Sequence, residues 1–418
     1  MINRSLREVT MSSRSLNVAP NQVKLVKSAL RRNSCPSQKA LAEELGLARS
    51  TVSHFFNGIP IDRLNFIEIC HILGLDWKVI SQTAILPIED ISYYVKRPTL
   101  ESLCYETLVQ PGALIRIKAP KKMGKTTLMN WLLQEAEQQG YRTADVNLLD
   151  AEEDSLSDLD LFLRWFCSCV GRQLGISREV LQELWDEEDG SKVNCNTYFE
   201  DCLLSASSQP LTLCIDQIDR IFPYNIAEDF LGLLRSWHEK AKRNSLWKKL
   251  RLVVVHSTEV YIPLDVNKSP FNVGEPIELP EFTLEQVQEL TQQYQLPLDS
   301  QQIQSLINWV GGHPFLIDRA LSMLKNLPDF TLENLLEKAP TLEGIYRSHL
   351  QELWSDLQQY TELMAALKQV IHADNSVCLE PMLTYKLYSL GLVKLAGNDI
   401  VPRCQLYRVY FCDRLDKI

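Results

Sequence analysis

One short segment, Ala119-Pro-Lys-Lys-Met-Gly124-Lys125-Thr126, constrains the fold of this chain more than any other feature. It follows a mostly apolar stretch, residues 113–118, and leads into residues 126–139, where apolar side chains recur at helical spacing. The order strand, loop, helix places the first turn of a helix at the edge of a sheet. Backbone N–H groups and the helix dipole at such a place attract an anion. We therefore expect an α/β unit with a phosphate-binding loop.

The segment matches the Walker A pattern of P-loop proteins except at its first position, where Ala119 replaces glycine. In that pattern Lys125 reaches the β- and γ-phosphates of a nucleoside triphosphate, expected to be ATP, and Thr126 coordinates Mg²⁺. Gly124 lets the backbone pass close to the ligand. The residues expected to surround the phosphates are Ala119, Pro120, Gly124, Lys125, Thr126 and Thr127.

A second motif points to the same site. Residues 211–215 are an uninterrupted apolar run, as in a strand buried on both faces, and Asp216 ends it. This carboxylate is expected to hold the magnesium ion through water, opposite Thr126. The next residue is Gln217, whose amide positions water but accepts no proton. Either Asp219 takes over as the catalytic base, or hydrolysis is slow and the site serves mainly to bind.

Apolar strand candidates alternate with helical segments up to residue 280, which predicts parallel strands in an α/β sheet. Beyond that point the pattern is helical, and Thr283 with Gln286 predicts a capping box. Gly397-Asn398 between two short alternating stretches predicts a hairpin. The expected organisation is a flexible tail (1–19), a helical domain (20–80), a linker (81–110), a P-loop core (111–280), a helical lid (281–340) and a winged-helix domain (341–418).

Over residues 90–418 the chain resembles the AAA-like branch of the bacterial STAND-type P-loop ATPases, signal-transducing relatives of the origin-recognition ATPases. Besides the two motifs above, the resemblance rests on Tyr-Val-Lys-Arg-Pro at 94–98, Ser-Thr-Glu at 257–259 and Gly-Gly-His-Pro at 311–314. It implies nucleotide contacts by Arg97, a place near the γ-phosphate for Ser257 and Thr258, and one near the base or β-phosphate for His313 and Pro314.

These residues also have purely structural explanations. Ser257 and Thr258 can simply end a strand, and Pro314 can simply begin a helix. Arg220 is expected to form a structural ion pair sooner than to act as an arginine finger. The basic residues between 240 and 251 are expected to lie on a solvated helix face, the alternative being contact with DNA or a neighbouring subunit.

Near the N-terminus, residues 36–58 have the pattern helix, tight turn, helix. Leu41 and Leu45 share one face of the first helix, and Val52 and Phe56 face back toward a core. Polar and basic side chains remain at the start of the second helix, where they suit base edges and phosphates in a major groove. The side chains expected to meet DNA are Gln38, Arg49, Ser50, Thr51 and His54.

Residues 20–80 resemble the λ-repressor-like (XRE) helix-turn-helix family, which implies an all-α fold and binding to double-stranded DNA. Residues 1–80 hold 11 Lys and Arg against 6 Asp and Glu, whereas the remainder holds 32 against 47. A basic head on an acidic body lets the head approach nucleic acid. Helix-turn-helix folds also serve as protein–protein adaptors, so an effector protein is the alternative partner.

The sequence contains no apolar stretch of the roughly 20 residues that a bilayer requires, so no membrane partner is expected. Its eleven cysteines form no CxxC pair and no Cys/His cluster with zinc spacing, as in a reduced cytoplasmic protein. We expect an ATP-binding switch, a DNA-binding regulatory or defence-type ATPase with slow hydrolysis and nucleotide-dependent self-association. The alternatives are a nucleotide-gated adaptor and a DNA-loading ATPase akin to the origin-recognition proteins.

Overall fold

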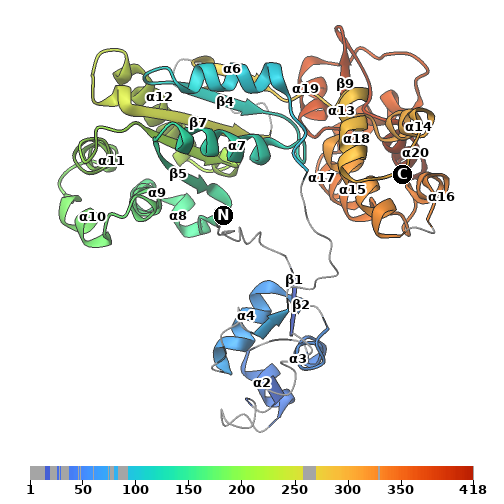
Figure 1. The fold of residues 1–418 in the computed structure, drawn as a ribbon, viewed down its shortest axis with the longest axis horizontal. Coiled ribbons are helices and arrows are strands. Elements are labelled where there is room, and N and C mark those ends of the chain that lie inside the picture. The colour runs from blue at the N-terminus through green and yellow to red at the C-terminus, as the bar shows by residue number, and fades with distance from the viewer. Residues whose placement is uncertain are drawn as a thin grey trace, which may run out of the picture. The chain divides into compact units, whose positions relative to one another are not determined.

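The structure is a computed structural model that describes residues 15–18, 26–27, 29, 37–45, 47, 49–59, 61–73, 75, 80–82, 93–257, 270–327 and 330–417. Two compact units divide the chain, residues 1–92 and residues 93–418, and each is considered by itself. The larger unit contains the parallel sheet and the C-terminal helices (Figure 1). Among the described residues no helix is both long and apolar enough to span a bilayer.

The smaller unit is built around a helix-turn-helix. Its helices are α2 (Gln38–Glu44), α3 (Arg49–Phe56) and α4 (Arg63–Ile72). Leu41, Val52 and Phe56 are buried as predicted, and Phe55 joins them, packing edge-on against Phe66 with ring centroids 5.0 Å apart. The α2–α3 pair is therefore held by an apolar core on its inner side.

The expectation of an all-α unit is incomplete, because three short strands accompany the helices. They are β1 (Ser15–Val18), β2 (Ile61–Asp62) and β3 (Ser81–Gln82), and β1 pairs antiparallel with both of the others. Residues 15–18 were expected to belong to a flexible tail, but they form the central strand of this small sheet. Strands this short gain their stability from distant partners, so local sequence gave no sign of them.

The larger unit begins with a P-loop core whose five strands are all parallel, in the order β5-β6-β7-β4-β8. The strands are β4 (Leu114–Lys118), β5 (Arg142–Asn147), β6 (Leu211–Asp216), β7 (Leu250–His256) and β8 (Glu275–Glu278). The helices of the core are α6 (Pro98–Leu108), α7 (Lys125–Gln138), α8 (Glu153–Ser157), α9 (Leu159–Gln173), α10 (Arg178–Leu184), α11 (Ser191–Tyr198) and α12 (Ile226–Ala241). The chain order of the strands differs from their spatial order, and β7 separates β4 from β6.

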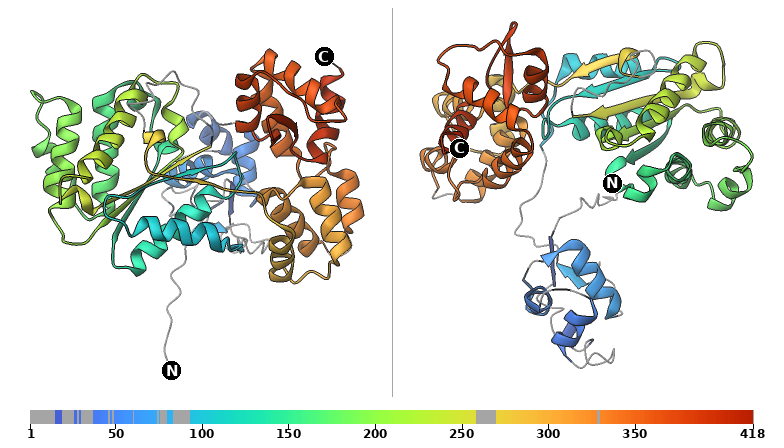
Figure 2. Two further views of the ribbon diagram at one scale, coloured as in Figure 1. Left: turned by 90° about the horizontal axis from the view of Figure 1, so that it is seen from above. Right: turned by 180° about the vertical axis from the view of Figure 1, so that it is seen from behind.

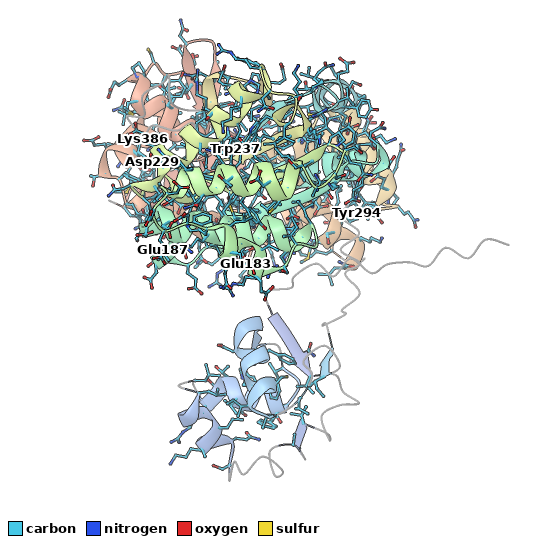
Figure 3. All side chains as sticks on the ribbon, turned by 90° about the vertical axis from the view of Figure 1, so that its left-hand side faces the viewer. Glu183, Glu187, Asp229, Trp237, Tyr294 and Lys386 are labelled. Carbon is cyan, nitrogen blue, oxygen red and sulfur yellow. The ribbon has the colours of Figure 1, made fainter. Side chains whose placement is uncertain are left out.

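Alternate residues of the strands enter two different cores, which is why β6 and β7 are apolar throughout. On one face, Leu252 and Val254 pack with α9, α11 and α12; on the other, Val253 and Val255 pack with α6 and α7. The first face is rich in aromatic rings, with Phe199 and Trp237 only 4.3 Å apart between centroids. Figure 3 looks onto α12, whose Asp229 and Trp237 are labelled.

The predicted linker, residues 81–110, is largely a helix where it is described. Residues 98–108 form α6, which buries Cys104 and Leu108 against the sheet. Pro98 occupies the first turn of α6, where proline is well tolerated because its missing N–H has no helical partner. The core therefore starts before residue 111.

The remaining residues form a C-terminal module that packs beside the sheet (Figure 2). Its elements are α13 (Leu284–Gln293), α14 (Ser300–Val310), α15 (Pro314–Asn326), α16 (Leu332–Lys338), α17 (Arg347–Gln358), α18 (Thr361–His372), α19 (Pro381–Ser389), β9 (Val393–Ala396), β10 (Asp399–Pro402) and α20 (Gln405–Leu415). The capping box of Thr283 and Gln286 is confirmed, and so is the hairpin at Gly397-Asn398.

One continuous apolar core runs through α13 to α20, so the predicted lid and winged-helix domain are packed as a single module. Val377 forms an isolated bridge with Ile400 beside the β9–β10 hairpin. Leu306 of α14, Tyr346 before α17 and Phe411 of α20 are each fully buried in this core. The winged-helix assignment itself stays a prediction.

Candidate functional site

The predicted phosphate loop joins the end of β4 to the start of α7. Gly124 caps α7 with φ of +91°, a left-handed conformation that suits glycine. Lys125 follows it and is buried, with Nζ donating to the carbonyl oxygens of Ala119 and Pro120, each at 2.8 Å. Burial lowers the pKa of this lysine to about 8, against the opposing pull of Asp219 and Asp216. The loop is thus wrapped around its lysine.

Thr126 and Asp216 meet as the two motifs predict, although they lie 90 residues apart in the chain. The Thr126 hydroxyl donates to Oδ2 of Asp216 at 2.8 Å, at the end of β6. Gln217 then takes up a left-handed conformation, with φ of +57°, and its N–H donates to Oδ1 of Asp216 at 2.8 Å. Both carboxylate oxygens are therefore oriented by their neighbours. Thr127 is exposed on the first turn of α7.

The other predicted catalytic acid, Asp219, is tied to the next strand. Its Oδ2 accepts from the backbone N–H of Ser257 at 2.6 Å, just beyond β7. Ser257 is buried, and Thr258 lies outside the described residues. A carboxylate engaged by a main-chain N–H is held in place, so Asp219 acts here as a brace between the ends of β6 and β7.

Arg97 lies against the loop from the residue before α6. It is 9 % exposed, with Nη2 donating to the carbonyl oxygen of Met123 at 3.4 Å and its guanidinium 5.0 Å from the ring centroid of Phe282. Burial lowers its pKa. The resemblance placed Arg97 at the nucleotide, and the structure places it against the loop residue before Gly124.

His313 and Pro314 begin α15, with Pro314 in its first turn. The His313 ring is buried, and its centroid is 5.8 Å from that of His349 on α17. His349 in turn lies 2.6 Å from the Tyr407 hydroxyl through Nε2 and 3.3 Å from Lys122 Nζ through Nδ1. Burial lowers the pKa of His313, and burial next to Lys122 lowers that of His349 to about 3. Both histidines are therefore held neutral behind the loop.

Sequence reasoning missed the contact between the loop and α17. Lys122 Nζ lies 2.5 Å from Oε2 of Glu352, and Lys121 Nζ lies 2.8 Å from Oδ2 of Asp356 and 3.6 Å from Oε1 of Glu352. We call these ion pairs of Lys121 and Lys122 with Glu352 and Asp356 the α17 clamp. No local signal could reveal it, since 230 residues separate Lys122 from Glu352.

The hairpin side of the C-terminal module also meets the loop. Arg403 is 5 % exposed, with Nη1 donating to Oε1 of Glu281 at 3.2 Å and lying 3.7 Å from the sulfur of Met123. A Cβ added to Gly391 would lie 3.0 Å from Cβ of Pro120. The loop is thus enclosed by the C-terminal module on this side as well.

Two buried guanidinium nitrogens near Met123 have no hydrogen-bond partner among the described residues, namely Nε of Arg97 and Nε of Arg403. Buried donors of this kind are rarely left unpaired, so each is typical of a site that takes a polar ligand or water. A cavity of about 790 Å³ is lined by Arg403 and Met123. Its lining includes Leu100, Pro120, Met123, Glu281, Tyr388 and Arg403.

In the N-terminal unit four of the five predicted DNA-contacting side chains, Gln38, Arg49, Ser50 and His54, are exposed, and Thr51 is half-buried. The four exposed side chains lie on the side of α2 and α3 away from the apolar core. Gln38 begins α2, Arg49 begins α3, and Ser50 lies in the first turn of α3. This is the placement that a groove-reading helix requires.

Two further predictions are resolved by contacts. Arg220 pairs with Glu153 at 3.8 Å, as the structural explanation predicted. The basic stretch between 240 and 251 is divided. Lys242, Arg243 and Lys248 are exposed, as expected of a solvated face, whereas Lys249 donates to the carbonyl oxygens of Leu204 and Ser207, and Arg251 donates to that of Leu108. Lys249 and Arg251 are therefore parts of the fold, while the other basic side chains of the stretch are at least partly exposed.

The five-stranded parallel sheet, the loop after β4 and the acid that ends β6 together define the fold class of the P-loop ATPases. A family model described as "AAA-like domain" matches residues 85–413, and one described as "Helix-turn-helix" matches residues 37–80. The chain belongs to the AAA-like domain family and carries a helix-turn-helix domain ahead of it. No curated protein matches it in sequence. The STAND branch of the resemblance stays a prediction.

One solved structure shares the fold, and another is similar at a lower score. A Walker-type ATPase of Pyrococcus abyssi is similar with a TM-score of 0.52 and 11 % identity, over 77 % of this chain and 97 % of its own. The ORC2 protein of Aeropyrum pernix, solved in ADPNP–ADP complexes, is similar with a TM-score of 0.49 and 16 % identity, over 77 % and 93 %. At such identities the likeness is one of fold alone.

Proposed function

We propose that this protein is an ATP-binding molecular switch in which nucleotide at the phosphate loop loosens the C-terminal module. The observation that carries the proposal is the α17 clamp, because it occupies two cations of the phosphate loop with carboxylates from that module. Triphosphate is the stronger competitor for the same cations. The phosphates would lie along the loop, and the base would enter the adjoining cavity of about 790 Å³.

The ion pairs of the α17 clamp are weak enough for a bound triphosphate to replace them. Lys121 is 47 % exposed and Glu352 is 41 % exposed, and ion pairs at such sites contribute about 0–1 kcal/mol each. Contacts this weak hold the module in place without nucleotide but yield to a ligand carrying several negative charges. The orphan Nε atoms of Arg97 and Arg403 offer further donors to that ligand.

Magnesium fits the geometry at the other end of the loop. The Thr126 hydroxyl and the Asp216 carboxylate, 2.8 Å apart, are hard oxygen ligands of the type that Mg²⁺ prefers. Bound there with a triphosphate, the ion would neutralise charge on the β- and γ-phosphates. Asp216 is held ready for this role by the N–H of Gln217.

We expect hydrolysis to be slow, because no free carboxylate follows Asp216. Gln217 positions water without accepting a proton, and Asp219 already accepts the N–H of Ser257. Replacing Gln217 by Glu should raise single-turnover hydrolysis by at least about 10-fold. An unchanged, near-zero rate in the variant would indicate a site built for binding alone.

We propose that the helix-turn-helix binds double-stranded DNA and that this binding is what the switch controls. The exposed side chains of Gln38, Arg49, Ser50 and His54 support this assignment. An effector protein bound by the same unit is the second candidate, favoured by the acidic balance of residues 81–418. Duplex binding by the full chain that weakens steeply with salt would support DNA, and its absence at low salt would support the adaptor.

The switch is tested by opening the clamp without touching the residues that hold phosphate. The double variant Glu352→Gln with Asp356→Asn should bind an ATP analogue about 3- to 10-fold more tightly, since nucleotide no longer competes with two ion pairs. Glu343→Gln is the matched control, because Glu343 pairs with Lys338 in the same module at 4.0 Å. Equal affinities in the wild type and the double variant would overturn the proposal.

A further inference from the structure

Three side chains of the kinds that bind transition metals converge on the surface of the C-terminal module. They are His372, the last residue of α18, and Cys412 and Asp416, which lie one turn apart at the end of α20. Their ligand atoms all lie within 4.8 Å of one another. None of them belongs to the phosphate loop, the α17 clamp or the adjoining cavity.

The contacts among the three show that they share one face. Nε2 of His372 lies 2.9 Å from Oδ1 of Asp416, and Sγ of Cys412 lies 3.7 Å from Oδ2 of the same carboxylate. Positions i and i+4 stand one above the other on a helix, which aligns Cys412 with Asp416. The packing of α18 against α20 then supplies the imidazole from a residue 40 positions earlier in the chain.

We propose that His372, Cys412 and Asp416 bind a divalent transition metal ion of the zinc class. An imidazole nitrogen, a thiolate sulfur and a carboxylate oxygen are the ligands that Zn²⁺ takes, whereas Mg²⁺ and Ca²⁺ select oxygen alone. Ligand atoms around a tetrahedral zinc ion lie about 3.6 Å apart. The 4.8 Å spread closes to that value by side-chain rotation, which is open to His372 and Asp416 because both are exposed.

Without a metal ion, Asp416 holds the other two groups, pairing with His372 through Oδ1 and accepting from the Cys412 thiol through Oδ2. The neighbouring cations are already engaged: Lys368, 3.8 Å from Asp416, donates to the carbonyl oxygen of Leu415, and Arg408 donates to the carbonyl oxygens of Ile371 and Ala373. These bonds cap the ends of α18 and α20, so a metal ion at Asp416 would compete only with the 3.8 Å pair to Lys368 and with the contacts to the two other proposed ligands.

Metal binding here exchanges protons for the ion. A cysteine thiol without a metal ion is mostly protonated near neutral pH. On binding, the S–H proton goes to solvent and the thiolate becomes a ligand. Affinity should therefore rise with pH up to the point where the metal hydrolyses.

A bound ion would join α18 to α20, because one ligand comes from the first helix and two come from the second. Ligands that bind only the folded state stabilise it by mass action. Zinc should accordingly raise the unfolding temperature of the C-terminal module. Metal binding at this site is measured without nucleotide, so its outcome does not depend on the proposed switch.

Cobalt(II) is the probe of choice, because a thiolate ligand gives it a near-ultraviolet charge-transfer band. Titration of the reduced, metal-free full chain with Co²⁺ should produce this band at one ion per chain, and Zn²⁺ should abolish it. Cys412→Ser should remove the band, whereas His372→Ala and Asp416→Asn should weaken Co²⁺ binding by about 10- to 100-fold.

The matched control is Cys378→Ser, which removes another exposed cysteine of the same module. It should leave both the band and the zinc-dependent rise in unfolding temperature unchanged. A band that survives Cys412→Ser, or that disappears with Cys378→Ser, would overturn the assignment. So would the absence of any stoichiometric Co²⁺ or Zn²⁺ binding to the wild type, whatever its affinity for nucleotide.

Discussion

A small module precedes the P-loop core in the chain and another follows it. Both combine helices with short strands, but one leaves its helix-turn-helix exposed and the other packs against the core. The N-terminal unit combines short helices with a three-stranded sheet and leaves the start of α3 exposed. The C-terminal module combines helices with the β9–β10 hairpin, but Tyr388, Lys394 and Arg403 turn toward the core and line its cavity. The side chains that such a module leaves exposed, more than its fold, therefore decide what the module can bind.

The largest expected effect concerns the loop that the C-terminal module encloses. Lys125→Ala removes the buried ammonium held by Ala119 and Pro120, and ATP-analogue affinity should fall by about 100-fold or more, because a charge-assisted contact to phosphate is lost. Titration with a fluorescent analogue measures this. Duplex binding by the N-terminal unit should stay unchanged in the absence of nucleotide; a parallel loss would show that the two modules are not separable.

Acid should weaken the C-terminal module. The pKa of His349 is about 3 in the folded state, below the usual value of about 6.5, so the unfolded state binds more protons between these values. Stability from this group is present above about pH 6.5 and is lost as pH falls toward 3, by about 2 kcal/mol between pH 7 and 5. Urea unfolding at the two pH values should show a smaller drop for His349→Gln. An equal drop would contradict the assignment.

A pair of glycines isolates the contact between hairpin and loop. Gly391 and Gly397 both have positive φ, at +78° and +68°, but only Gly391 has Pro120 within reach of an added Cβ. Gly397→Ala should destabilise the chain by about 1 kcal/mol from backbone strain alone, and Gly391→Ala by about 1–2 kcal/mol. Urea unfolding of both variants measures the difference. Equal losses of unfolding free energy in the two variants would mean that Pro120 moves aside for the added Cβ at residue 391 without a measurable penalty.

The smallest effect belongs to the N-terminal unit. Arg49→Ala should weaken duplex binding by about 3- to 10-fold and reduce its salt dependence by the equivalent of one phosphate contact. Arg49→Lys distinguishes two roles: full recovery indicates a phosphate contact, and partial recovery indicates that the guanidinium fork reads a base. Affinity measured across a salt series gives both quantities. Neither variant should change nucleotide affinity.

Local patterns predicted the features that depend on local sequence. The loop at Lys125, the acid at Asp216, the α2–α3 pair and the hairpin at Gly397 each rest on residues close together in the chain, and all form as predicted. Residues 98–108 were expected to belong to a linker, but they form α6, and Pro98 lies in its first turn, a position that proline favours.

Features that depend on distant partners could not be predicted. The strand at 15–18 exists only through its pairing with residues 61–62 and 81–82. The clamp between Lys122 and Glu352 joins side chains that carry no motif of their own. Cys412 and His372 show no zinc spacing in the sequence, and only the packing of α18 against α20 brings them together.

The left-handed turn at Gln217 separates the orientation of Asp216, which depends on the main chain, from the chemistry of the side chain at position 217. The bond that orients Asp216 comes from the main chain of residue 217, so any side chain that tolerates the left-handed conformation there leaves the bond in place. If Asp216 binds magnesium and residue 217 positions the attacking water, as we propose, substitution at 217 can alter the rate of hydrolysis while Asp216 keeps its orientation. On the proposed mechanism, the lifetime of the nucleotide-bound state could thus be changed at residue 217 without altering the residues proposed to hold the nucleotide.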